Sequence, residues 1–166
     1  MALAMLAAPV MAKPPETPKK IPVTFVRSGG HPISRGWNWT TPGGVFHQRD
    51  GVHGITNHAL EGVEEDLSEY ELYGHSDSTY MTDINLKTMK GSQKYKITLG
   101  YQQGTFEGVY ICKGTFFLVE EGVYRIYTGV IHAVWHGTGA YLGWTLTVDT
   151  ELEEGTPKPQ VYLLIP

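Results

Sequence analysis

Short runs of alternating apolar and polar residues, separated by glycine-containing turns, cover most of the chain from residue 23 onward. Turn signals such as Ser28-Gly29-Gly30, Asp50-Gly51 and Gly137-Thr138-Gly139 leave room for strands but not for long helices. Residues 63–70 also fit one face of a short helix, but a strand is the favoured interpretation of 67–73. The pattern predicts strands at 23–28, 34–41, 44–49, 52–60, 67–75, 79–89, 94–103, 105–112, 114–120, 123–136, 140–149 and 161–165.

This spacing is typical of a single all-β antiparallel domain with little or no helix, and we favour a barrel over a sandwich. The apolar run at 161–165, VYLLI, is too hydrophobic for a free tail. Because each buried aliphatic side chain stabilises the fold by about 1.5–3 kcal/mol, we expect this run to pair with a barrel strand or with a neighbouring subunit.

Composition supports this fold class and removes others. The chain has 166 residues, 20 of them glycine, and only 18% are charged. Low charge, high glycine and many aromatics disfavour a coiled coil, a helical bundle and a disordered chain. The net charge of -4 gives no global positive field, so nucleic acid is not an expected partner.

The chain divides into three expected parts. Residues 1–12, MALAMLAAPVMA, resemble a short signal peptide ending in Val10-Met11-Ala12, although a positive n-region is missing. They are too short to span a bilayer, which needs about 20 residues. A Pro-rich arm at 13–31 and a β-barrel domain at 32–166 follow. If the first segment is a signal, the protein is secreted or in the cell envelope; otherwise it is cytoplasmic.

A register follows from Asp50-Gly51 if these residues form a two-residue hairpin turn. Phe46, Gln48, His53 and Ile55 would then share one face, which is the better core face, and His47 and Arg49 would lie outside. His53 is therefore a candidate ligand-binding residue.

Two strand-like segments repeat the pattern glycine-x-aromatic-x-glycine, at 104–108 and 139–143. Residues 100–149, with the run GTFEGVYICKGTFFLVEEGVYRIYTGVIHAVWHGTGAYLGWTLTVD, resemble the second half of an allene-oxide-cyclase-like or dirigent-like barrel. The resemblance implies an eight-stranded antiparallel barrel with an apolar lumen, which is often a homotrimer in that family. The family's catalytic carboxylate, arginine and tyrosine have no residue-by-residue match here. A lipocalin-like barrel is the nearest alternative.

Metal and nucleophile signals are weak. Of the seven histidines, His132 and His136 have chelating spacing for a helix, but on a strand their Cα atoms lie about 13 Å apart. No metal site and no cofactor is therefore expected. Cys112 is the single cysteine, and we interpret it as a buried structural thiol.

Glu107 and His132 are the catalytic candidates. Glu107 would enter the lumen only if Phe106 faced outward. A three-residue loop at Gly137-Thr138-Gly139 would pair His132 with Trp144 and turn both into the lumen, and this is the favoured register. A two-residue loop would turn His132 outward.

The sequence thus predicts an exported barrel that binds a small apolar or aromatic molecule in its lumen. The candidate ligand-binding residues are His53, Tyr110, His132 and Trp144. One alternative is a cyclase or isomerase of an apolar substrate, with one ionisable side chain handling a proton. The other is a structural or carbohydrate-binding surface protein that uses Trp37, Trp39 and Trp135.

Overall fold

The computed structural model describes residues 17–28, 31–154 and 160–166. The expected signal segment, residues 1–12, lies outside these residues. The described residues form ten strands and two single-turn 3-10 helices, η1 (Ser68–Tyr70) and η2 (Gly139–Tyr141). The strands are β1 (Lys19–Ser28), β2 (His31–Ser34), β3 (Trp37–Thr40), β4 (Val45–Gly62), β5 (Tyr73–Asn85), β6 (Lys90–Tyr101), β7 (Thr105–Glu120), β8 (Val123–Gly137), β9 (Thr145–Leu152) and β10 (Val161–Ile165).

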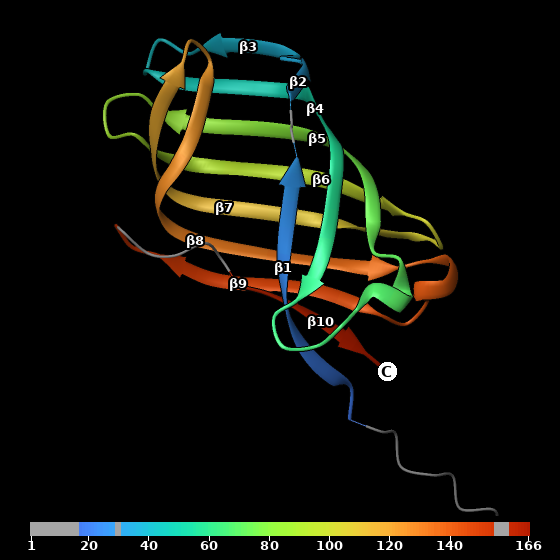
Figure 1. The fold of residues 1–166 in the computed structure, drawn as a ribbon. Coiled ribbons are helices and arrows are strands. Elements are labelled where there is room, and N and C mark those ends of the chain that lie inside the picture. The colour runs from blue at the N-terminus through green and yellow to red at the C-terminus, as the bar shows by residue number, and fades with distance from the viewer. Residues whose placement is uncertain (1–16, 29–30, 155–159) are drawn as a thin grey trace, which may run out of the picture.

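Eight of these strands form a closed, entirely antiparallel ring of hydrogen-bonded pairs. Strands β4 to β10 pair in chain order, and β1 pairs with both β10 and β4. In Figure 1, β1 and the end of β4 cross in front of the other strands. The short strands β2 and β3 pair with the first half of β4. The all-β antiparallel prediction is confirmed, and so is the pairing of residues 161–165. No helix in the described part of the chain is long and apolar enough to cross a membrane.

The Pro-rich arm ends earlier than expected. β1 begins at Lys19, so most of the second half of the expected arm, residues 13–31, is a strand of the ring. Its alternate residues Ile21 and Val23 are almost fully buried. The apolar positions of this segment therefore contribute to the core, despite its prolines and lysines.

The expected hairpin at Asp50-Gly51 is wrong, because β4 runs through it. Gln48 pairs with Thr82 and Gly51 pairs with Tyr80, so β4 has one residue more than β5 between these pairs. This is a β-bulge, and Asp50 adopts a left-handed φ of 56° there. The extra residue reverses the inward and outward alternation of the side chains that follow it. A two-residue turn would have had the same effect. Phe46, Gln48 and His53 therefore still share the inner face.

The connection between β8 and β9 is longer than the expected three-residue loop. His136 pairs with Thr145, and His132 pairs with Asp149 rather than with Trp144. Residues 139–141 form η2 instead of a strand, because the Tyr141 ring turns inward and stacks on Phe106 with centroids 5.3 Å apart. The register prediction for His132 is thus wrong, and this side chain is exposed on the outer face.

The two ends of the ring are packed by different elements. At one end Phe106, Tyr101 and Tyr141 form an aromatic core, and residues 68–70 are a 3-10 turn rather than the expected strand. At the other end the tip of the β7–β8 hairpin curls over the sheet (Figure 1). Tyr124 from this tip packs on Phe46, with ring centroids 4.9 Å apart.

Candidate functional site

Three tyrosines lie side by side on the inner face of β5, β6 and β7. Tyr80 pairs with Tyr95, and Tyr95 pairs with Tyr110. Their ring centroids are separated by 5.5 Å and 5.6 Å respectively. All three are partly exposed, although buried residues flank them on the same face of each strand. We call Tyr80, Tyr95 and Tyr110 the tyrosine row.

Buried glutamines fix the first two rings of the row. Gln48 Nε2 donates hydrogen bonds to Tyr80 Oη at 3.3 Å and to Arg35 O at 2.9 Å. Tyr95 Oη donates to Gln93 Oε1 at 3.4 Å. Burial raises the pKa of Tyr80, so this phenol is neutral at physiological pH. Tyr80 and Tyr95 are therefore held in place by side chains of the protein itself.

Gly51 makes room for the first ring. The Tyr80 ring lies across this glycine, and a Cβ built on Gly51 would be 2.3 Å from Tyr80 Cζ. Glycine in the bulged part of β4 thus allows the ring to lie flat against the strand. An alanine here would displace the Tyr80 ring.

One buried donor beside the row has no hydrogen-bond partner among the described residues: Trp135 Nε1. The Trp135 ring stacks on Tyr110 with centroids 6.4 Å apart. A buried donor without an acceptor costs free energy on the order of 1–3 kcal/mol. An acceptor atom on a bound molecule would remove that cost.

The residues predicted from the sequence are not brought together. His53 and Tyr110 lie on the inner face, and Tyr110 is part of the row. Trp144 lies at one end of the ring, where it contacts Tyr70 and Tyr141. His132 is exposed on the outer face, away from the inner-face residues.

Glu107 also lies outside the ring. Its side chain is exposed and pairs in register with His136. The neighbouring Phe106 is fully buried, so alternation along β7 directs Glu107 outward.

The sequence interpretation missed Tyr80 and Tyr95. A signal was present, because Tyr80, Thr82 and Ile84 alternate along one strand, and Tyr95, Ile97 and Leu99 along the next. Only the pairing of the two strands brings the rings together.

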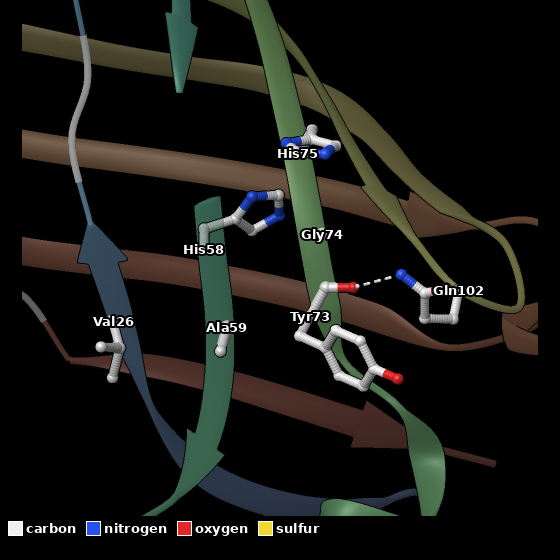
Figure 2. A pocket seen from close by; sticks show the side chains of 7 residues that line it. All are labelled: Val26, His58, Ala59, Tyr73, Gly74, His75 and Gln102. Carbon is white, nitrogen blue, oxygen red and sulfur yellow. Dashed lines mark hydrogen bonds between the residues drawn. The ribbon is translucent and has the colours of Figure 1, made fainter. Parts of the chain in front are cut away.

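A separate hollow lies where the last part of β4 pairs with β1 and with the start of β5 (Figure 2). It has a volume of about 400 Å³ and is lined by Val26, His58, Ala59, Tyr73, Gly74, His75 and Gln102. The His58 ring stacks on Phe25, with centroids 5.2 Å apart, and packs at a tilt against Tyr101, with centroids 4.8 Å apart. Gln102 Nε2 donates to Tyr73 O at 3.4 Å on its rim. The hollow is open to solvent and is lined by both polar and apolar side chains.

A third cluster lies on the outer face of β3, β4 and β5 and comprises Trp37, Trp39, His47, Arg49 and Asp83; we call it the tryptophan cluster. Asp83 Oδ1 is 2.5 Å from His47 Nδ1 and accepts a hydrogen bond from Arg49 Nη2 at 2.7 Å. The His47 ring stacks on Trp39 with centroids 4.9 Å apart. His47 and Arg49 thus lie outside, as predicted.

The charge of Asp83 depends on its two partners. Burial alone raises the pKa of Asp83, but the hydrogen bonds from Arg49 and His47 outweigh it, and the net pKa lies below its ordinary value of 3.8. Since the pKa is lower in the folded state, this carboxylate stabilises the fold above the unfolded pKa, and the contribution is lost as pH falls through the folded pKa.

We therefore expect Asp83→Asn to destabilise the protein at about pH 6 and to have a smaller effect at about pH 2.5. Urea unfolding of both proteins at the two pH values measures the difference. A destabilisation of equal size at both pH values would show that the charge of Asp83 contributes nothing.

Cys112 lies on the inner face of β7 and is almost fully buried, which confirms the structural interpretation of this thiol. Burial raises the pKa of Cys112 to about 11. We expect it to react with dithionitrobenzoate at least ~100-fold more slowly in the native protein than in guanidinium at the same pH. Stoichiometric reaction of the native protein within minutes would contradict this placement.

Within the described residues, no group of three or more His, Cys, Asp or Glu side chains is placed to hold a metal ion. Comparison with protein-family models, with curated protein sequences and with solved structures finds no match to this chain. Function is therefore inferred from the chemistry of the three sites above.

Proposed function

We propose that the protein binds a small, flat, largely apolar molecule on the tyrosine row. The observation that carries this proposal is that three neighbouring aromatic rings face the inside of a closed ring and remain partly exposed. Aromatic surface that is ordered and only partly covered suits a stacked ligand, and each ring contact adds about 0.5–1.5 kcal/mol beyond burial.

The polar groups around the row favour an uncharged ligand. The buried polar side chains of the described residues are Gln48, His58, Ser76, Ser78, Thr82 and Gln93, and none of them is Asp, Glu, Lys or Arg. A charged ligand would lose its hydration without gaining a counter-charge there. The buried indole N–H of Trp135 beside Tyr110 supports a ligand with one hydrogen-bond acceptor.

The finer features of the proposal concern the scaffold. We infer an eight-stranded barrel of the allene-oxide-cyclase-like, dirigent-like or lipocalin-like kind, and the closed ring of eight strands supports it. Export, which was inferred from residues 1–12, stays a prediction. So does a trimeric assembly, which the family resemblance implies. A binding protein is favoured over the cyclase or isomerase, because the carboxylate candidate Glu107 is exposed on the outer face.

Titration with N-phenyl-1-naphthylamine, an uncharged aromatic probe whose fluorescence rises on binding, tests the proposal. We expect saturable binding that Tyr95→Leu weakens about fivefold to tenfold, because loss of one stacked ring removes about 1 kcal/mol. Gly51→Ala displaces the Tyr80 ring and is expected to weaken binding as well.

The matched control is Tyr127→Leu, which removes an exposed tyrosine of β8. Circular dichroism checks that each variant folds. Absence of saturable binding to the wild type would contradict the proposal. So would equal affinities of the Tyr95, Gly51 and Tyr127 variants.

A further inference from the structure

The tryptophan cluster lies on the opposite face of the sheet from the tyrosine row. Trp37 pairs with Arg49, and Trp39 pairs with His47. Since residues two apart on a strand point to the same face, both indoles lie outside, about 7 Å apart along the strand. Trp37 is 75% exposed and Trp39 is 47% exposed.

Two neighbouring indoles are unusual on a free surface. Tryptophan is one of the residues enriched where proteins bind partners, because it offers a large rigid apolar face and one donor. In the described part of the chain, β3 pairs with β4 alone, so its other edge is open to an approaching chain.

The two charged side chains beside the indoles, Arg49 and Asp83, form an ion pair. Arg49 Nη1 donates to Gln48 O and Thr82 O, at 2.8 Å and 3.0 Å, and Nη2 donates to Asp83. The guanidinium is thus held in place and its charge is balanced by Asp83. Both described hydrogen bonds of Asp83 fall on Oδ1, which leaves Oδ2 to accept another.

We propose that the tryptophan cluster is a second binding site and that its ligand is an uncharged saccharide chain. A sugar ring has an apolar C–H face, which stacks on an indole, and hydroxyl groups at its edge. Asp83 Oδ2 and His47 Nε2 are the groups that hydrogen-bond to those hydroxyls. Trp37 offers the more exposed indole for this stacking, because His47 and Arg49 already pack against Trp39.

The charges in the tryptophan cluster favour a saccharide over nucleic acid and over an organic cation. Nucleic acid requires several uncompensated cations, whereas here Arg49 is paired with Asp83 and the net charge of the chain is -4. A bound organic cation requires aromatic faces without a competing cation, but Arg49 already lies over Trp39, 5.6 Å from the ring centroid.

Affinity electrophoresis in gels that contain hydroxyethylcellulose, laminarin or galactomannan tests the inference, with dextran sulfate as an anionic comparison. We expect at least one of the three uncharged polymers to retard the protein. Trp37→Ala is expected to weaken that binding at least ~fivefold, because one stacked ring is lost. Trp37 is exposed, so this variant keeps the fold.

Two controls separate this site from the tyrosine row. Phe117→Ala removes an exposed aromatic ring elsewhere, and Tyr95→Leu alters the row; both are expected to retain full retardation. Retardation by dextran sulfate alone would overturn the inference, as would no retardation in any gel. Equal retardation of the Trp37→Ala and Phe117→Ala variants would also overturn it.

Discussion

Replacing Leu163 with alanine is expected to lower the melting temperature by about 10 °C, within a range of about 4–20 °C. Leu163 is fully buried in the middle of β10, between Ile21 on β1 and Leu146 on β9. A buried leucine truncated to alanine costs about 2–5 kcal/mol, and each kcal/mol corresponds to about 2–4 °C in a chain of this length.

The position of β10 explains why truncation of Leu163 is expected to lower the stability so strongly. β10 joins β1 to β9, and β1 in turn pairs with β4, so loss of β10 packing weakens the closure of the ring. Leu142→Ala is the matched control, because Leu142 is 78% exposed in the β8–β9 connection. Thermal unfolding by circular dichroism measures both variants. Similar melting temperatures of the two would show that β10 does not close the ring.

Gly108→Ala is expected to be the second strongly destabilising change. A Cβ on Gly108 would lie 2.0 Å from the backbone oxygen of Val134 and 2.7 Å from Trp135 Cα. These are main-chain atoms of the neighbouring strand β8, so an added methyl group forces β7 and β8 apart. Overpacking of this kind costs about 1–3 kcal/mol or more.

Urea unfolding measures the effect, with Gly43→Ala as the control. A Cβ on Gly43 would meet one atom, Thr41 Oγ1, at a comfortable 3.8 Å. If the Gly108 and Gly43 variants have equal free energies of unfolding, the close approach of β7 to β8 is wrong.

The fold class could be predicted from the sequence because alternation and turn spacing reflect burial on one face of a sheet. The inner face of β4 was also predictable, since a bulge and a two-residue turn at Asp50-Gly51 exchange the faces of the chain in the same way. The direction of the chain after residue 50 was not predictable, because Asp50-Gly51 suits both a turn and a bulge. Only the long-range pairing of β4 with β5 decides between them.

The site was less predictable than the fold. The prediction for His132 depended on the length of one loop, and burial of Tyr141 lengthened that loop and reversed the expected face. Tyr110 was named as a ligand-binding candidate and lies on the inner face, but its partners Tyr80 and Tyr95 come from strands up to 30 residues earlier in the chain. Their alignment is a property of sheet register, which local alternation does not contain.

The tyrosine row as a ligand surface is tested most directly by nuclear Overhauser effects between bound N-phenyl-1-naphthylamine and protein in which the tyrosine rings alone are carbon-13 labelled. Single tyrosine-to-phenylalanine variants assign the ring signals. We predict contacts from the probe to the rings of Tyr80, Tyr95 and Tyr110, and none to the exposed Tyr127. Contacts confined to Tyr73, in the hollow between β4 and β5, or to Tyr127 would contradict the proposed site.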